Sequence, residues 1–158
     1  MIPDVGLCIF TVETNTTKIK VKGVLTNCGK QTVYFEKVDV FKVKKIDSLK
    51  IKNNGRFSFS TTAKIHDFYQ LRLSENKIIS LLLEPKEKAS ISADINNLDN
   101  TLIVKGSKGS RLLNELLKKL KITKSELDSI SNIYNNSTDE TTKEDLIEEY
   151  KEIIEEHR

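Results

Sequence analysis

The sequence predicts an α+β fold, in which an N-terminal antiparallel β-sandwich or open barrel precedes a C-terminal segment of two to three helices. Two observations indicate this division. Apolar residues alternate with polar ones over residues 17–105, and they recur at helical spacing after Gly109. The charge changes at the same place, since residues 1–110 carry 18 Lys and Arg against 11 Asp and Glu, whereas residues 111–158 carry 8 against 12. Such asymmetry is typical of two differently built parts.

The composition is that of a globular protein. Of the 158 residues, 37% are hydrophobic and 31% charged, and no apolar run approaches the roughly 20 residues that span a bilayer. We expect a β-sandwich-like domain over residues 1–107 and a helical connector over residues 108–158. The first ten residues, MIPDVGLCIF, lack the basic region and long apolar run of an export signal.

Strands are expected wherever apolar residues alternate with polar neighbours. The pattern marks eight or nine short strands, centred on Ile19/Val21, Val33/Phe35, Val38/Val40, Leu49/Ile51, Phe57/Phe59, Tyr69/Leu71/Leu73, Leu81/Leu83, Ile91/Ala93/Ile95 and Leu102/Val104. Residues 27–30 (NCGK) and 53–56 (NNGR) predict hairpin turns, because Asn and Gly tolerate positive φ. A proline turn at 84–87 (EPKE) separates two further strands.

Three helices are expected after Gly109. The first is capped by Ser110 and carries an apolar stripe of Leu112, Leu113, Leu116, Leu117 and Leu120. A capping box at 123–126 (TKSE) predicts the start of the second, with Leu127, Ile130, Ile133 and Tyr134 on one face. After a polar break at 135–138, the third begins near Thr141 and has the stripe Leu146, Ile147, Tyr150, Ile153 and Ile154. No stop signal precedes Arg158, so we expect this face to continue toward further chain.

The loop between the two parts, residues 106–110 (GSKGS), has the composition of a phosphate-binding or nucleophile loop. It matches neither the G-x-x-x-x-G-K-[ST] nor the G-x-S-x-G spacing. We therefore interpret it as a turn, with Gly106 ending a strand and Ser110 capping a helix. Anion binding at the helix N-terminus is a minor alternative.

A nucleic-acid surface is also disfavoured. Residues 56–59 (RFSF) follow a glycine, as in aromatic strands that stack bases, but both phenylalanines fall on one strand face, which is typical of a core. The lysine clusters at 18–22 and 42–45 fit the solvated face or guarded edge of a sheet better than a phosphate contact. No nucleic-acid partner is expected.

Residues with catalytic potential form no defensible constellation. Cys8 and Cys28 give no Cys-x-x-Cys or metal spacing, although they can pair if the protein is exported. His66 and Asp67 are neighbours, so their side chains point apart, and the scattered carboxylates have no acid/base spacing (Asp39, Asp47, Asp94, Asp99). We expect no catalytic, cofactor-binding or metal-binding residue in this chain.

The order of several weak motifs resembles a known family. They are I-x-V-x-G (19–23), VYF (33–35), IDSLKI (46–51), N-G-x-F-x-F (54–59), F-Y-x-L-x-L (68–73), LEP (83–85), ISAD (91–94), VKGS (104–107) and S-x-LLNELL (110–117). This pattern is similar to the domain of unknown function that precedes the thioredoxin-like domain in exported thiol-disulfide oxidoreductases of Gram-negative gut bacteria. The resemblance covers the chain from about residue 17 onward.

The resemblance implies a non-catalytic accessory module, covalently linked to a thioredoxin-like domain in the full-length protein. That module would position the redox domain or recognise its protein partner, in the periplasm or as an envelope lipoprotein. The family's Cys-x-x-Cys is absent from this chain, which implies a connector truncated before the redox domain. A homodimer through the C-terminal helices is a further expectation.

Two other hypotheses compete with this one. The first is an independent β-sandwich module that binds a glycan or peptide; exposed aromatic residues on one sheet face, above all Tyr34 and Tyr69, would favour it. The second, less favoured, is a small enzyme that uses the serines of loop 106–110.

Overall fold

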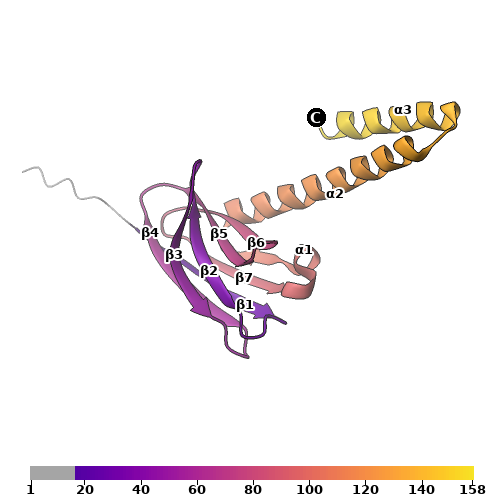
Figure 1. Cartoon of the computed structure of the whole chain (residues 1–158). Coiled ribbons are helices and arrows are strands. Elements are labelled where there is room, and N and C mark those ends of the chain that lie inside the picture. The colour runs from indigo at the N-terminus through magenta and orange to yellow at the C-terminus, as the bar shows by residue number, and fades with distance from the viewer. Residues whose placement is uncertain (1–16) are drawn as a thin grey trace, which may run out of the picture.

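The computed structural model describes residues 17–158 and confirms the predicted α+β fold. Two four-stranded sheets are followed by two long helices that extend away from them (Figure 1). Sheet A has the order β4-β1-β7-β8, and sheet B has the order β3-β2-β5-β6. The strands are β1 (Thr17–Thr26), β2 (Thr32–Val38), β3 (Val43–Lys50), β4 (Arg56–Ala63), β5 (Asp67–Ser74), β6 (Lys77–Leu83), β7 (Lys88–Asp94) and β8 (Ile103–Lys105).

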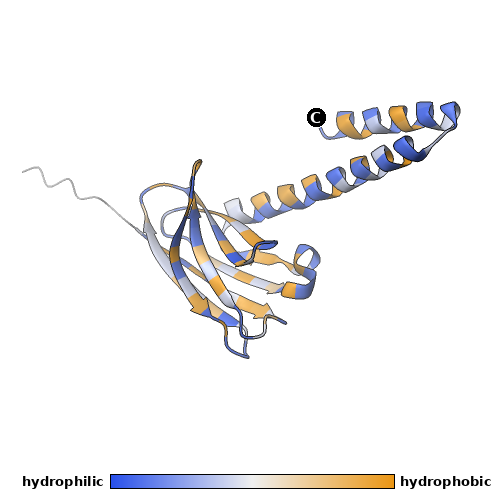
Figure 2. Cartoon of the chain, viewed as in Figure 1, coloured by the Kyte–Doolittle hydropathy of each residue, from blue (hydrophilic) through white to orange (hydrophobic). Residues whose placement is uncertain are grey.

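The core lies between the two sheets, and alternation along the strands builds it. Hydropathy alternates visibly along the strands of both sheets (Figure 2). Phe35 of β2 is fully buried, with its ring stacked 5.5 Å from both Phe59 of β4 and Tyr69 of β5. Phe57 is buried beside Phe59, which confirms that both phenylalanines of residues 56–59 face the core.

One strand pairing differs from the antiparallel prediction. β1 and β7 are parallel, whereas the other strand pairs are antiparallel. The chain leaves sheet A after β1 and returns to it twice, and so long a connection permits parallel pairing. Gly23 of β1 is needed here, because a Cβ at this position would lie 1.9 Å from the carbonyl oxygen of Ile91.

The predicted turns form, but neither Asn-Gly-type turn makes a hairpin. Asn27, Gly29 and Gly55 have positive φ, as expected. Residues 27–30 carry the chain from β1 in sheet A to β2 in sheet B, and residues 53–56 carry it from sheet B back to sheet A. The hairpins instead join β2 to β3 and β5 to β6. Positive φ reverses the chain direction without deciding which sheet the next strand joins.

Val40 lies outside any strand. It is 86% exposed in the turn between β2 and β3, so the strand expected around Val38 and Val40 is the end of β2. A 3-10 turn, η1 (Ile95–Asn97), and a short helix, α1 (Leu98–Thr101), separate β7 from β8.

Two long helices follow β8, and the capping box at 123–126 does not begin a helix. α2 (Lys108–Asn136) runs through it without a break, and α3 (Glu140–Glu156) follows. The apolar stripe explains this, because Leu120, Leu127 and Ile130 stay in helical register across the box. The polar break expected at residues 135–138 lies instead at residues 137–139, because Asn135 and Asn136 still belong to α2. The Asp139 carboxylate accepts a hydrogen bond from the Thr142 N–H and caps α3.

Candidate functional site

The loop at residues 106–110 is the junction between the sandwich and the helices, as predicted. Gly106 has φ +77°, and a Cβ on it would lie 2.2 Å from the carbonyl oxygen of Lys88, so only glycine fits. Ser107, rather than the predicted Ser110, is the N-cap of α2, and its hydroxyl accepts a hydrogen bond from the Ser110 N–H at 3.2 Å. The first turn of the helix already has a partner inside the chain.

Ser110 is fully buried and bridges the helix to strand β6. Its hydroxyl accepts a hydrogen bond from the Leu82 N–H at 3.0 Å and donates one to the Leu82 carbonyl oxygen at 2.9 Å. The Ser107 hydroxyl lies 3.1 Å from the same oxygen. One turn further along α2, the Asn114 side-chain amide donates to the carbonyl oxygen of Ser80 at 2.7 Å. We call Ser107, Ser110 and Asn114 the serine clamp.

The serine clamp covers a sheet edge with side chains. β6 is the edge strand of sheet B, and its outward main-chain groups at residues 80 and 82 would otherwise be open to another strand. Because the N-cap Ser107 and two side chains of α2 take up these groups, the clamp both protects the edge and fixes α2 to the sandwich.

The helices α2 and α3 form an arm that projects from the sandwich and folds back on itself (Figure 1). At 29 residues, α2 is about 43 Å long. Ile130 of α2 and Leu146 of α3 are buried where the two helices pack. Much of the predicted apolar stripe is nevertheless exposed, at Leu112, Leu116, Leu117, Leu120, Ile122, Ile133, Tyr134, Ile147, Tyr150 and Ile154. Neither arm helix nor any other described helix has the length and apolar character required to cross a membrane.

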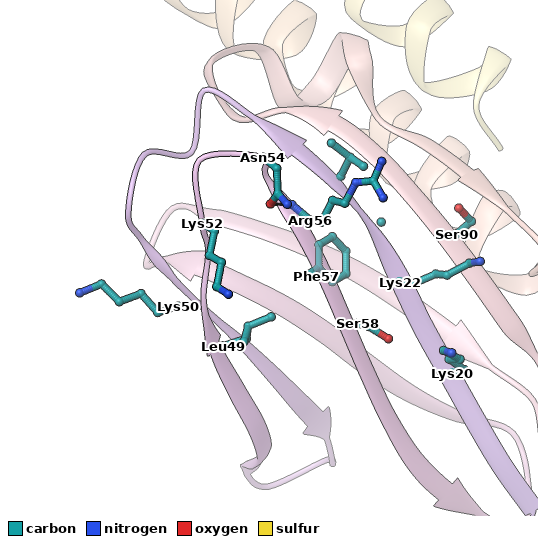
Figure 3. A pocket seen from close by; sticks show the side chains of 12 residues that line it. Lys20, Lys22, Leu49, Lys50, Lys52, Asn54, Arg56, Phe57, Ser58 and Ser90 are labelled. Carbon is teal, nitrogen blue, oxygen red and sulfur yellow. Dashed lines mark hydrogen bonds between the residues drawn. The ribbon is translucent and has the colours of Figure 1, made fainter.

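A basic groove of about 680 Å³ lies on the outer face of sheet A (Figure 3). Lys20 and Lys22 of β1 and Arg56 of β4 line one side, and Lys50 and Lys52 reach it from the end of β3. Ser58 and Ser90 provide hydroxyl groups between the cations. The lining of the groove contains no acid–base pair. Its lysines belong to the solvated sheet face that the alternating lysines of the sequence predict.

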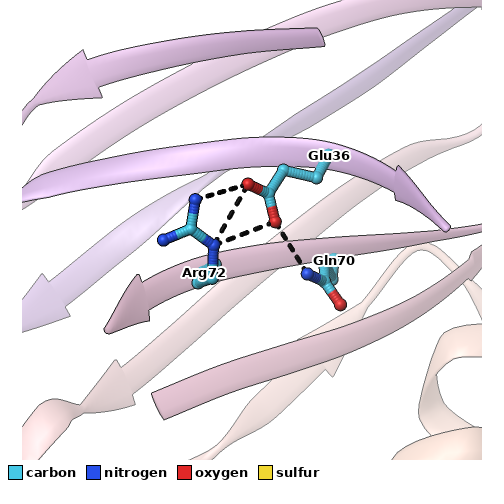
Figure 4. Close-up of polar contacts among 3 residues, drawn as sticks. All are labelled: Glu36, Gln70 and Arg72. Atoms are coloured by element: carbon cyan, nitrogen blue, oxygen red, sulfur yellow. Dashed lines mark hydrogen bonds and ion pairs between the residues drawn. The ribbon is translucent and has the colours of Figure 1, made fainter. Parts of the chain in front are cut away.

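A buried charge lies on the outer side of sheet B. Glu36 is 4% exposed, and Arg72 holds its carboxylate through both Nε and Nη2, at 3.1 and 2.6 Å (Figure 4). Gln70 donates a third side-chain contact at 2.7 Å. The Arg72 guanidinium is the main cause of the lowered pKa of Glu36, which burial opposes. The arrangement has no free acid or base, so it is a structural ion pair.

The sequence does not reveal this ion pair, because its members are 34 and 36 residues apart. They meet through the β2–β5 register, which pairs Tyr34 with Arg72 and Glu36 with Gln70. The guanidinium of Arg72 also lies 4.4 Å from the centre of the Tyr34 ring. Only knowledge of which strands pair would have located the constellation.

The two tyrosines named as possible ligand contacts do not form an exposed aromatic surface. Tyr69 is 2% exposed in the core, where burial raises the pKa of its phenol. Tyr34 is half-buried beside Arg72. The sheet face therefore lacks the aromatic pair that would favour a glycan site.

The remaining predicted candidates are not brought together. Cys28 is buried and its thiol lies 3.1 Å from the Leu25 carbonyl oxygen, while Cys8 and its pairing lie outside the described residues. Asp67 pairs with Lys37 at 2.5 Å, and this contact lowers the pKa of the Asp67 carboxyl.

The scattered aspartates have local roles or separate positions. Asp94 caps η1, Asp99 pairs with Lys121, and Asp39 and Asp47 each accept a hydrogen bond from the next residue's N–H. Over residues 17–158, no three His, Cys, Asp or Glu side chains gather as metal ligands.

Residues 18–113, which include all eight strands except the first residue of β1, match the family model described as Domain of unknown function (DUF4369). The match ends within the first turns of α2, so it includes Ser107 and Ser110. None of the curated proteins matches the chain.

Proposed function

The chain belongs to the DUF4369 family of domains of unknown function, and we propose that it is the non-catalytic positioning module of an envelope thiol-disulfide oxidoreductase of the thioredoxin family. In this proposal the sandwich is the anchored or partner-binding body, and the arm leads to a covalently linked thioredoxin-like domain. The module acts in the periplasm or tethered to the outer membrane.

The serine clamp is the observation that carries the proposal. A connector that positions another domain must leave its own domain in a fixed direction. Ser110 and Asn114 satisfy edge main-chain groups of β6, so α2 cannot swing away without leaving those groups without protein partners. A flexible tether would instead be rich in Gly and Ser and would make no such contacts.

A positioned redox domain has a chemical use. A thioredoxin-like domain attacks a disulfide of another protein with one exposed sulfur, so the rate depends on access to that sulfur and on its orientation. The sandwich and its arm add contact area and a fixed offset that a small redox domain lacks. The buried Cys28 thiol is not placed to perform this reaction.

The proposal is tested by sequencing the source gene beyond the codon for Arg158. We expect a Cys-x-x-Cys at the start of a helix, following a strand, within about 150 residues, a typical domain length. A stop codon soon after Arg158 would overturn the redox assignment. The alternative, an independent module for a glycan or peptide, would then be tested by binding to glycan and peptide arrays.

A further inference from the structure

The apolar stripe of α2 is continuous, but α3 covers only part of it. Near the tip of the arm, Ile130 packs under α3 and is 6% exposed. Near the base, Leu112, Leu116 and Leu120 continue the same stripe and are 50%, 53% and 56% exposed. Since α3 has 17 residues against 29 in α2, it is about 18 Å shorter and cannot cover the base.

The exposed base of the stripe faces away from the sandwich. Successive helical residues are turned by about 100°, so Leu112 and Leu116 lie about 200° around α2 from Ser110 and Asn114, which contact β6. A partner can therefore reach these leucines without displacing the sandwich. We call Leu112, Leu116 and Leu120 the base ridge.

The tip of the arm carries an apolar groove that can take such a ridge. The groove has a volume of about 450 Å³ and lies between α2 and α3. Its apolar lining is Ile130, Tyr134, Leu146, Ile147 and Tyr150. We call these five residues the tip groove.

The two ends of the arm also differ in charge. Residues 108–124 at the base of α2 carry six Lys and Arg and one Asp or Glu, a net charge of +5. α3, which begins at the tip and runs back along α2, carries two Lys and eight Asp or Glu, a net charge of −6. The ridge therefore lies in a basic helix segment and the groove beside an acidic helix.

We propose that two copies of this chain pair through their arms in antiparallel orientation, with the base ridge of each seated in the tip groove of the other. A two-fold axis across the middle of the arm brings base to tip at both ends, so one symmetric dimer buries both ridges and joins +5 to −6 twice. A parallel pair would place base against base and tip against tip, which opposes like charges.

A second copy is the occupant that the charges favour. An unrelated apolar partner would not require opposite charges at the two ends of the arm. Here the basic base of one copy is complemented by the acidic α3 of a second copy. The proposal uses the arm of the proposed function but not the link to a redox domain. The gene sequence and the oligomeric state can therefore fail independently.

The first test measures the molar mass of the 158-residue chain by light scattering after size-exclusion chromatography. We expect about twice the mass of 18.0 kDa. Leu112→Glu with Leu116→Glu should weaken the dimer at least about tenfold, because a charge replaces each seated leucine. The matched control, Val40→Glu, changes an exposed apolar residue of the sandwich and should leave the dimer intact. A monomeric parent chain, or a dimer that survives the leucine substitutions, would overturn the proposal.

A charge exchange tests the antiparallel geometry and does not depend on the leucines. One variant carries Lys119→Glu and Lys124→Glu at the base, and the other carries Glu144→Lys and Glu148→Lys on α3. Each alone should dimerise more weakly than the parent, because the substitutions lower the net charge of the base from +5 to +1, and that of α3 from −6 to −2. Mixed together, they should favour a heterodimer, since one of its two contacts joins the unaltered base (+5) of one chain to the unaltered α3 (−6) of the other.

The control for the charge exchange is Lys20→Glu with Lys22→Glu on the outer face of β1, which should dimerise like the parent. Circular dichroism of every variant should show the parent's helix content. A mixture that associates no more tightly than either folded variant alone would rule out the antiparallel arrangement.

Discussion

The hydroxyl of Ser110 lies between the two main-chain groups of Leu82, 3.0 Å from its nitrogen and 2.9 Å from its carbonyl oxygen. A single side chain thus makes both hydrogen bonds that a neighbouring strand would make to this residue. The contact joins the first turn of α2 to the edge of sheet B, and it is the physical basis for treating sandwich and arm as one body.

Replacing this hydroxyl should destabilise the fold. Ser110→Ala leaves the Leu82 N–H without its side-chain partner, whereas the Leu82 carbonyl oxygen keeps the Ser107 hydroxyl, and we expect a loss of about 1–3 kcal/mol in the free energy of unfolding. Urea denaturation followed by circular dichroism measures it. The control, Ser125→Ala on the exposed side of α2, should stay within about 0.5 kcal/mol of the parent. Equal stability of the two variants would show that the clamp contributes nothing.

The Glu36–Arg72 pair should make stability depend on pH. The pKa of Glu36 is lowered in the folded chain by Arg72, so its contribution is fully present above the unfolded value of about 4.3 and is lost as the pH falls through the folded pKa. Glu36→Gln should cost about 1.5–3 kcal/mol at neutral pH, because it removes a charged hydrogen-bond acceptor.

Below the folded pKa of Glu36, the parent and the Gln variant should converge in stability. Urea denaturation at neutral and at acidic pH gives both differences, with the exposed Glu126→Gln as control. A cost that is the same at both pH values would mean that the effect of Glu36→Gln is not due to the carboxylate charge.

Gly29 and Gly55 both have positive φ, so their alanine variants separate the cost of backbone strain from the cost of a steric contact. Gly29 has φ +56° and open space around it, so Gly29→Ala should cost only about 1–2 kcal/mol for the left-handed conformation. Gly55 has φ +68°, and a Cβ on it would lie 2.2 Å from the carbonyl oxygen of Leu25. Gly55→Ala should therefore cost about 1–3 kcal/mol more. Thermal unfolding compares them, and similar midpoints would contradict the contact at Gly55.

The periodicity of the sequence was enough to predict most of the strands and their buried faces, because alternation is a local property, although Val40 lies outside any strand and Leu49 is exposed. Phe57 and Phe59 illustrate this, since their spacing alone places both in the core. Pairing is not local. The parallel contact between Gly23 and Ile91, and the meeting of Glu36 with Arg72, depend on which strands become neighbours.

The helix boundaries show that a local sequence signal can also mispredict the structure. Residues 123–126 have the side chains of a helix start, yet the apolar stripe on either side keeps them inside α2. Likewise, the serines of loop 106–110 are residues that commonly cap helices, but only the proximity of β6 explains why Ser110 is buried. Tertiary contacts therefore decided what local pattern left open.

The chain alone should not reduce disulfides. Its described cysteine, Cys28, is 4% exposed, and a buried thiol cannot reach the disulfide of another protein. Insulin reduction with dithiothreitol should proceed at the rate of the blank. A faster rate that is lost in Cys28→Ser would refute the non-catalytic role.

The most direct test of the positioning role is a distance distribution between sandwich and arm. The chain would carry nitroxide labels at Ser60→Cys in β4 and Asn132→Cys near the arm tip, with Cys8→Ser and Cys28→Ser to remove the native thiols. Pulsed electron paramagnetic resonance then measures the distance between the two labels, after dilution with unlabelled chain. We predict one narrow distance that broadens when Ser107→Ala and Ser110→Ala are added. A broad distribution in the parent chain would contradict the account, because an arm that swings freely cannot position a second domain.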